Sequence, residues 1–336
     1  MFPHKSILIV TDMDDDLHAA VVVDELKKRG ERVVCLDPRK LIEGEVSFSI
    51  AENTFANLCP PQDAFSAEDI KSVLYRRPSV IPEDQRVNEE YRPFVRKEWL
   101  SVIAGLWEVL EDHGALMVSN PSHIQRAEIK LRQLYVAREL GFRLPRTLVT
   151  NSVAQVSAFF ANQNSILAMK KLRSHSIVAG EHSALFVTTL LKDIDQLEKA
   201  NLSLCPAVFQ EFIPKQFDVR LIVVGARVFA FKIHSQSNDE TKIDYRAGKE
   251  KTQDLFHEQY EPPPELVDKC LKMLQRFELR FGAFDFVINQ DNEHVFLELN
   301  PNGQWLWLQL KTGANIVEAF CDLLSRSPIP NRHVMT

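Results

Sequence analysis

The sequence predicts a mixed α/β protein with more than one domain. Its 336 residues are too many for one typical hydrophobic core, so we expect two or three domains. Near the N-terminus, two apolar runs flank an amphipathic helix pattern, and this order is typical of a parallel sheet. Later in the chain, apolar runs joined by short polar turns indicate antiparallel hairpins.

The first part of the chain is predicted to form a β-α-β unit and further strands. Strands are predicted at 6–11, 32–36, 46–48, 72–75 and 115–119, and helices at 17–29 and 91–112. The acidic run 12–16 lies before the first helix, where we expect it to face solvent and to be favoured by the helix dipole. Arg76 and Arg77 end one strand, and either a bound anion or a surface salt bridge would suit them.

The second part is predicted to be richer in hairpins. Helices are predicted at 125–140, 153–161, 265–277 and 316–324, and strands at 145–149, 166–172, 186–190 and 207–212. Residues 217–224 and 227–234 form a clear hairpin around Gly225 and Ala226. A last hairpin joins 281–288 to 294–300.

The bulk composition is that of an ordinary globular protein, with 45% hydrophobic and 26% charged residues. A net charge of −6 and the absence of a basic run give no indication of nucleic-acid binding. The five cysteines lack CxxC spacing, which indicates reduced thiols. No apolar run approaches the roughly 20 residues that a bilayer crossing needs, and residues 1–5 do not open a signal peptide. We therefore expect a cytoplasmic protein with no membrane partner.

The last hairpin carries the most informative polar residues. If Asp291 and Asn292 form a two-residue turn, Asp285 falls opposite Glu298. Glu298 and Asn300 then share one face, while Leu297 and Leu299 point the other way. Two facing carboxylates would repel each other, and a bound divalent ion such as Mg²⁺ would remove the conflict. The alternative is that either carboxylate pairs with a buried arginine or lysine.

Other residues in the second half suit a nucleotide without a Walker A loop or a GxGxxG motif. Lys170 lies in a predicted strand and could reach phosphates, whereas Lys171 alternates to the opposite face. Asp218 and Arg220 share a strand face, and they either pair with each other or bind substrate. Trp305 and Trp307 are expected to pack in the interior, or else to line a peptide site.

Taken in order, these residues resemble the ATP-grasp superfamily. The pattern is Lys130, Lys170, Gln210-Glu211-Phe212-Ile213-Pro214, Asp218-Val219-Arg220, Asp244-Tyr245-Arg246, Asp285 and Glu298-Leu299-Asn300-Pro301. Within the superfamily, the chain most resembles the microviridin or graspetide type of ribosomal peptide (RiPP) maturase. The resemblance implies an N-terminal Rossmann-like pre-ATP-grasp domain (1–120), a central domain (121–206), a C-terminal ATP-grasp domain (207–325) and a flexible tail (326–336).

The resemblance also implies roles for individual residues. Lys130 and Lys170 would contact phosphates, although Lys130 could instead be one charge on a solvated helix. Gln210, Glu211 and the Phe212 backbone would hold adenine, and Asp218 would lie near the ribose or the substrate. Arg246 would touch the triphosphate, and Lys170, Arg220 and Arg246 are the expected catalytic residues. Asp285, Glu298 and Asn300 would bind two Mg²⁺ ions, or Mn²⁺.

The implied activity is that of an ATP-dependent carboxylate ligase. It would activate Asp or Glu side chains of a precursor peptide as acyl phosphates and form ω-ester or ω-amide crosslinks. The peptide would carry a leader segment, and the enzyme would be a homodimer. A loop at 173–183 would cover the phosphates, although Gly180 is the single glycine in that segment. Two alternatives remain: a ligase for a free amino acid or small peptide, and an ATP-binding regulatory protein without turnover.

Overall fold

The computed structural model describes residues 5–12, 14–43, 46–49, 54–57, 65–78, 83–162, 166–172, 177–179, 182–184, 188–194, 202–246 and 255–326. Gly180 and nearly all of the predicted tail lie outside these residues. Among the described helices, none combines the length and apolarity that crossing a membrane requires. The four described cysteines are free thiols.

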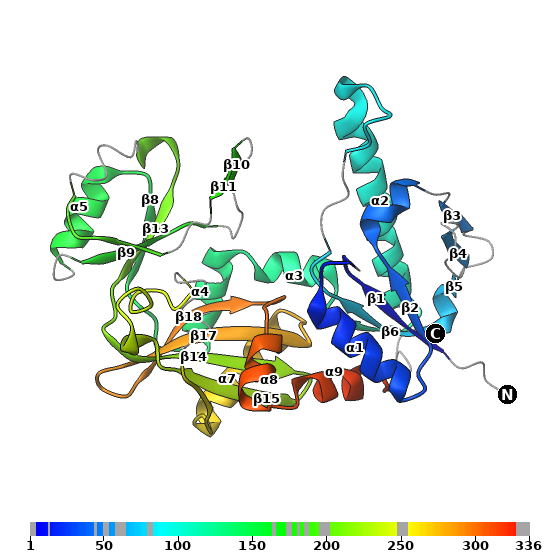
Figure 1. The fold of residues 1–336 in the computed structure, drawn as a ribbon. Helices are drawn as coiled ribbons and strands as arrows, with labels where there is room; N and C mark the ends of the chain where they lie inside the picture. The colour runs from blue at the N-terminus through cyan, green and yellow to red at the C-terminus, as the bar shows by residue number, and fades with distance from the viewer. Residues whose placement is uncertain are drawn as a thin grey trace, which may run out of the picture.

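The N-terminal part is a parallel sheet with a helix on each face (Figure 1). Its strands, in spatial order, are β2 (Val33–Leu36), β1 (Ser6–Val10), β6 (Ile70–Tyr75) and β7 (Leu116–Val118). Successive residues of a strand point to opposite faces. Ile7 and Ile9 therefore pack with α1 (Leu17–Lys28), while Leu8 and Val10 pack with α2 (Arg92–Asp112). The predicted β-α-β unit is confirmed.

Two larger antiparallel sheets follow in the described part of the chain. One, with α5 (Val153–Ala161), has the order β12 (Thr189–Leu191), β9 (Leu167–Lys170), β13 (Ala207–Glu211) and β8 (Thr147–Thr150). The other has the order β16 (His257–Gln259), β15 (Arg227–Ile233), β14 (Lys215–Val224), β17 (Phe281–Asn289) and β18 (His294–Asn300). We call them the small sheet and the large sheet.

Helices cover both faces of the large sheet. On one face lie α3 (Pro121–Ala127), α4 (Lys130–Glu139) and α7 (Pro264–Arg276). On the other lie α8 (Leu306–Thr312) and α9 (Ile316–Leu324). The remaining strands are β3 (Val46–Ser49), β4 (Thr54–Asn57), β5 (Phe65–Ser66), β10 (Ile177–Ala179) and β11 (His182–Ala184). Short 3-10 turns span Pro38–Glu43, Ala67–Asp69, Glu89–Tyr91, Leu202–Leu204 and Ser235–Ser237.

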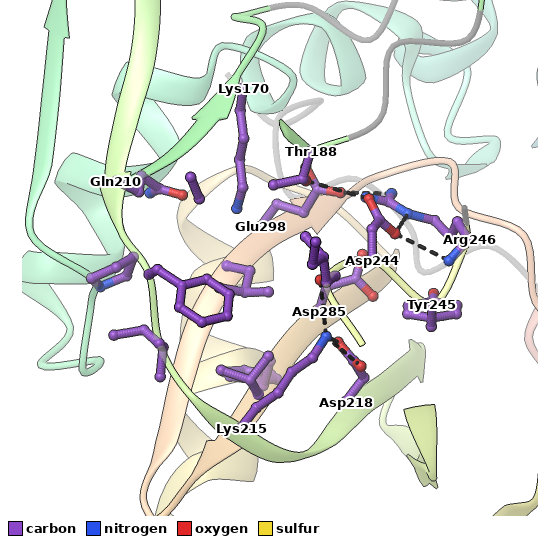
Figure 2. Close-up of a pocket in the computed structure, with 18 of the residues that line it drawn as sticks. Lys170, Thr188, Gln210, Lys215, Asp218, Asp244, Tyr245, Arg246, Asp285 and Glu298 are labelled. Atoms are coloured by element: carbon purple, nitrogen blue, oxygen red, sulfur yellow. Dashed lines mark hydrogen bonds and ion pairs between the residues drawn. The ribbon is translucent and has the colours of Figure 1, made fainter. Parts of the chain in front are cut away.

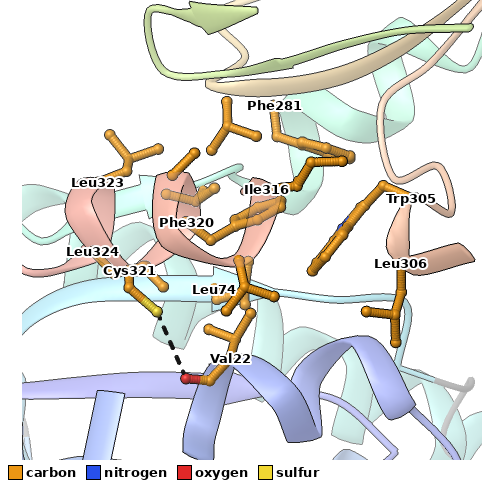
Figure 3. Packing of buried hydrophobic residues seen from close by; sticks show 14 of the residues in the cluster. Val22, Leu74, Phe281, Trp305, Leu306, Ile316, Phe320, Cys321, Leu323 and Leu324 are labelled. Atoms are coloured by element: carbon orange, nitrogen blue, oxygen red, sulfur yellow. Dashed lines mark hydrogen bonds between the residues drawn. The ribbon is translucent and has the colours of Figure 1, made fainter. Parts of the chain in front are cut away.

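One hydrophobic core joins the N-terminal sheet to the large sheet (Figure 3). Leu74 comes from the parallel sheet and Phe281 from the large sheet, and α9 lies between them with Phe320. Trp305 is 1% exposed and stacks on Phe320, with ring centroids 5.0 Å apart. The predicted packing role of Trp305 is therefore confirmed.

The predicted helix 125–140 is wrong as a single element. The chain forms α3 and α4 instead, and Ile129 between them has an extended backbone (φ −72°, ψ 100°). Neither Glu128 nor Ile129 is a helix-breaking residue type, so the sequence carries no signal for the break. Buried Gln133 stabilises it, because its side chain donates to the carbonyls of Ala127 and Leu299 and accepts from Leu299 N.

The predicted exposure of the acidic run 12–16 is only half right. Asp14 and Asp15 are exposed, and Asp16 caps α1 by accepting from His18 N at 2.9 Å. Asp12, however, is 8% exposed and lies 3.5 Å from the Arg39 guanidinium. Burial beside a cation from the next loop is a tertiary contact that the local sequence does not indicate.

The last hairpin has the predicted pairing of Asp285 with Glu298, but its turn differs from the prediction. Its loop has three residues, because Asn289 N donates to Glu293 O, and Asn292 is left-handed (φ 62°). Leu297 is then an extra residue on β18, and this bulge restores the pairing of Asp285 with Glu298. The two-residue turn is thus wrong, while the facing carboxylates are confirmed.

Candidate functional site

A cavity of about 440 Å³ lies between the small sheet and the large sheet (Figure 2). Except for Arg220, every residue proposed from the sequence for nucleotide or metal lines it: Lys130, Lys170, Gln210, Glu211, Phe212, Asp218, Arg246, Asp285, Glu298 and Asn300. Leu297 also lines it, against expectation, because it sits at the bulge. The structure brings these residues together; their roles toward a ligand stay predictions.

Glu298 is held by two cations on the large-sheet wall. Its Oε2 accepts from Lys130 Nζ at 3.1 Å, and its Oε1 accepts from Arg246 Nη1 at 3.3 Å. Burial opposes the charge of Glu298, but Lys130, Arg246 and Lys170 together hold its pKa well below the usual range. Glu298 is therefore ionised at neutral pH, and Lys130 is not merely one charge on a solvated helix.

Asp285 is paired with Arg220 behind the cavity wall. Arg220 Nη1 lies 2.7 Å and 2.8 Å from the two carboxylate oxygens, and Nη2 donates to Gln304 O at 3.1 Å. Burial raises the pKa of Asp285, and the guanidinium opposes that shift. The alternative in which Asp218 and Arg220 pair with each other is wrong.

Lys170 extends from β9 toward Glu298 (Figure 2). Burial lowers its pKa to about 8, and the positive charges of Lys130 and Arg246 act in the same direction. Lys171 also lines the cavity, so the expected alternation to the opposite face does not exclude it from the site. Lys170 is thus cationic at neutral pH but loses its proton at a lower pH than an ordinary lysine does.

The end of β13 forms the small-sheet wall. Gln210 is 3% exposed and its Nε2 donates to Thr147 Oγ1 at 3.0 Å. Glu211 Oε2 accepts from Arg146 N at 3.2 Å. Phe212 and Ile213 follow and line the cavity with apolar surface. A flat ring with polar edges would suit this wall.

Lys215 is a cavity residue that the sequence analysis did not single out. Its Nζ donates to Asp218 Oδ1 at 2.8 Å and to Ile243 O at 3.1 Å, while Asp218 Oδ2 accepts from Ser235 Oγ at 2.5 Å. Residues three apart in a regular strand point to opposite faces. A bulge at Gln216 brings Lys215 and Asp218 to the same face, which the sequence pattern could not reveal.

The segment after Ile243 is fixed by its own ion pair. Asp244 Oδ1 accepts from Arg246 Nε at 2.9 Å and from Arg246 N at 3.1 Å, and Asp244 Oδ2 accepts from Thr188 Oγ1 at 3.3 Å. Burial opposes the charge of Asp244, but the hydrogen bonds from Arg246 lower its pKa. The segment thereby aims Arg246 at Glu298.

The two arginines that follow β6 differ in their roles. Arg76 is 3% exposed and donates to Asn302 O at 2.8 Å, so it is an interior tie between the N-terminal sheet and the turn after β18. Arg77 has a left-handed backbone (φ 43°) and lines the cavity. A surface salt bridge is therefore wrong for Arg76, and an anion-binding role stays a prediction for Arg77.

The fold has close counterparts among solved structures. A RiPP-associated ATP-grasp ligase from Chryseobacterium gregarium, in complex with ADP and a leader and core peptide, is 26% identical with a TM-score of 0.85, covering 95% of this chain and 96% of that one. The macrocyclase MdnB from Microcystis aeruginosa MRC is 26% identical with a TM-score of 0.77, covering 96% and 99%.

This protein has the ATP-grasp fold. The macrocyclase MdnC from Microcystis aeruginosa MRC, bound with precursor peptide MdnA, shares that fold at 24% identity and a TM-score of 0.81, with 95% and 99% of the chains covered. No protein-family model matches the sequence, and no curated protein is similar to it in sequence. The ATP-grasp fold implied by the resemblance is confirmed. The domain boundaries and the Rossmann-like assignment stay predictions.

The donors on the large-sheet wall of this ATP-grasp protein fit a hard divalent cation. Asp285, Glu298 and Asn300 offer carboxylate and amide oxygens to one cavity, and Mg²⁺ prefers oxygen ligands. Each carboxylate has about four acceptor positions, so an ion pair with Arg220 or Lys130 leaves others available. These three residues would hold the ion.

Proposed function

We propose that the protein is an ATP-dependent ligase that crosslinks a ribosomal precursor peptide through its Asp or Glu side chains. The observation that carries the proposal is the 440 Å³ cavity in which Asp285, Glu298 and Asn300 face the same space as Lys170 and Arg246. Cationic and metal-binding groups around one cavity are what phosphoryl transfer needs, because its catalysis is mostly positioning and charge neutralisation.

The similar structures support the choice of substrate. The Chryseobacterium gregarium ligase is in complex with ADP and with a leader and core peptide, and MdnB is described as a macrocyclase. By analogy, ATP would occupy the cavity between the two sheets, and a precursor peptide with a leader segment would supply both reacting groups. Fold analogy sets this expectation, and the residues of the cavity give it a mechanism.

In the first step, a peptide carboxylate attacks the γ-phosphorus of ATP, and the bond to the β-phosphate oxygen breaks to release ADP. Lys170 and Arg246 would neutralise charge on the transferring phosphoryl group. Bound Mg²⁺, held by Asp285, Glu298 and Asn300, would supply further charge neutralisation. Gln210, Glu211 and Phe212 would position the adenine, so that the γ-phosphate lies near Lys170.

In the second step, a hydroxyl or amine of the same peptide attacks the acyl phosphate carbon. Inorganic phosphate leaves, the nucleophile loses its proton, and an ω-ester or ω-amide crosslink remains. Arg220, fixed by Asp285 and Gln304 O, would act as a positioning residue for the carboxylate wall. Excluding water would protect the intermediate from hydrolysis.

The decisive experiment is mass spectrometry of the precursor peptide after incubation with the protein, ATP and Mg²⁺. A loss of roughly 18 Da for each crosslink is expected, since each condensation removes one water. A mass gain equal to an added amino acid would instead show the ligase for free amino acids. No peptide-dependent ADP would contradict both and favour a regulatory ATP-binding protein.

Glu298→Ala tests directly whether Glu298 takes part in the proposed metal site. We expect ADP formation to fall by about 10³-fold, because a group that organises transition-state charge is lost. Glu293→Ala on the same hairpin is the matched control, because Glu293 pairs with Arg143 and does not line the cavity. ADP release, measured with a coupled assay on cooperatively folded variants, should be unchanged in this control. Retained turnover in Glu298→Ala would contradict the assignment.

A further inference from the structure

Of the described residues that line the cavity, Arg77 alone comes from the N-terminal sheet. It follows β6 by two residues, whereas the other described lining residues lie between positions 130 and 300. The chain adds β2 on one side of β1 and later adds β6 on the other side. In open parallel sheets, ligands bind at the carboxyl ends of the strands where the direction changes in this way. Arg77 therefore lies at a place where such a sheet commonly meets a ligand.

The backbone of Arg77 is held in a conformation that its own sequence disfavours. Its φ of 43° is in the left-handed region, which side-chain-bearing residues rarely adopt, and the following Pro78 favours an extended backbone before it. Arg76, just before it, is anchored at both ends: its N donates to Val10 O at 2.8 Å and its Nη1 donates to Asn302 O at 2.8 Å. A backbone of this kind persists only where its surroundings fix it. The direction in which the Arg77 side chain leaves the backbone is therefore fixed by the fold.

Arg77 is a cavity cation without an anionic partner in the described part of the chain. Lys130, Lys215 and Arg246 each pair with a carboxylate that also lines the cavity. Arg77 is exposed, and no residue within the described ranges forms a hydrogen bond or an ion pair with its guanidinium. A guanidinium with a free edge offers two parallel N–H groups, which match the two oxygens of a carboxylate.

The position of Arg77 along the large sheet favours a peptide carboxylate over a phosphate of ATP. The wall proposed for adenine ends at Phe212, just before β14 begins, and the proposed metal ligand Asp285 pairs with the middle of that strand. Asn302, which accepts from Arg76, follows the end of β18 that lies on the far side of Asp285 from the adenine wall. In phosphoryl transfer the attacking and leaving oxygens are roughly in line with phosphorus, so the attacking group approaches from the side opposite ADP. Arg77 lies on that side.

We propose that Arg77 binds the reacting carboxylate of the peptide and presents one of its oxygens to the γ-phosphorus of ATP. The inference rests on the proposed function and names the residue that receives the Asp or Glu side chain. One edge of the guanidinium donates to the carboxylate, and a lone pair of one carboxylate oxygen forms the new bond to phosphorus. The bond from phosphorus to the β-phosphate oxygen breaks, and ADP leaves with that electron pair. No proton is transferred in this step.

Two measurements on Arg77→Ala test the proposal. The kcat/KM of ADP formation for the precursor peptide should fall by about 100-fold, because a bidentate contact between charged groups is lost. The Kd for ATP in the absence of peptide should change by less than about twofold, because the side chain contacts the peptide. Wild-type kcat/KM in Arg77→Ala would overturn the proposal. A loss confined to ATP affinity would also overturn it and would assign Arg77 to the γ-phosphate.

Arg86→Ala is the matched control. Arg86 is an exposed arginine of the N-terminal part that pairs with Asp84 and does not line the cavity. Both kcat/KM for the peptide and Kd for ATP should keep their wild-type values in this variant. If the wild type forms ADP with the peptide and Arg77→Ala does so equally well, this inference fails and the proposed function stands. No peptide-dependent ADP from the wild type would overturn both.

Two further substitutions separate binding from folding. Arg77→Lys keeps the charge but loses the paired N–H groups, so it should recover at most about tenfold of the lost kcat/KM. Arg77→Gly removes the side chain and suits a positive φ, so its urea midpoint should equal or exceed that of the wild type. Its kcat/KM should nevertheless stay as low as that of Arg77→Ala. Full recovery in Arg77→Lys, or wild-type kcat/KM in Arg77→Gly, would overturn the bidentate contact.

Discussion

Lys170 shows how a single residue can make the proposed ATP site sensitive to pH. Burial lowers its pKa to about 8; the Glu298 carboxylate opposes this shift, and the positive charges of Lys130 and Arg246 add to it. Below pH 8 the side chain is cationic and attracts phosphate, and above pH 8 it becomes neutral. If only the cationic form binds, the dissociation constant for ATP should rise by about tenfold between pH 7 and pH 9. Isothermal titration calorimetry at several pH values measures this change.

Two lysine variants separate Lys170 from its neighbour. Lys170→Met should weaken ATP binding at pH 7 and flatten the pH dependence, because the titrating group is gone. Lys171→Met should weaken binding less and keep the dependence centred near the Lys170 pKa of about 8. An unchanged pH profile in Lys170→Met would show that another group is responsible.

At the scale of elements, the turn after β18 packs directly against the part of the large sheet that carries Arg220 and Asp285. A Cβ on Gly303 would lie 2.6 Å from Ala283 Cβ and 2.7 Å from Arg220 Nη2, closer than side chains normally approach. Gly303→Ala should therefore shift the guanidinium that holds Asp285. We expect unfolding to require about 1–3 kcal/mol less, and ADP formation by the folded variant to fall by about tenfold.

The control for this substitution lies on the opposite face of the same strand pair. A Cβ on Gly282 would meet Leu274 Cδ2 at 2.7 Å and Leu299 Cδ1 at 2.8 Å, in the core under α7. Gly282→Ala should lower the urea midpoint but leave kcat unchanged. Wild-type kcat in Gly303→Ala would mean that the Arg220 contact does not position the site.

The sequence predicted most strands and helices at this scale but not their irregularities. Hydrophobic periodicity located the last hairpin, while the bulges at Gln216 and Leu297 depend on pairing across the sheet. The break before Lys130 depends on Gln133 binding the edge of β18. Lys170, Asp218, Asp285, Glu298 and Asn300 were predicted from residue type and strand position, whereas Lys130 and Arg246 came only from the resemblance to the ATP-grasp superfamily. The ion pairs within the cavity were not predicted, since Lys130 and Glu298 are 168 residues apart.

At the scale of the whole molecule, one core unites the N-terminal sheet and the large sheet, while the small sheet has its own. Trp305 is central to the shared core, between Phe320 and the edge of His18. Trp305→Ala should lower the free energy of unfolding by about 3–5 kcal/mol, because it leaves a large cavity. The N-terminal and large sheets should still unfold together, which urea titration followed by hydrogen exchange can measure.

Leu204→Ala is the control for this loss, because Leu204 is 83% exposed and its truncation should change the unfolding free energy by less than about 0.5 kcal/mol. Separate transitions for the N-terminal and large sheets would contradict a shared core. Earlier exchange in β9 and β13 alone would agree with the independent packing of the small sheet.

The two ion pairs of Glu298 have a consequence for how the nucleotide-free site would bind ATP. Lys130 and Arg246 are far apart in the sequence, and both already pair with the Glu298 carboxylate. We expect the triphosphate of ATP to displace the Glu298 carboxylate from these two cations. Binding of ATP would then exchange one anionic partner of Lys130 and Arg246 for another, because neither cation is unpaired beforehand. The same exchange would weaken the binding of free inorganic phosphate, because phosphate must compete with the Glu298 carboxylate for the two cations.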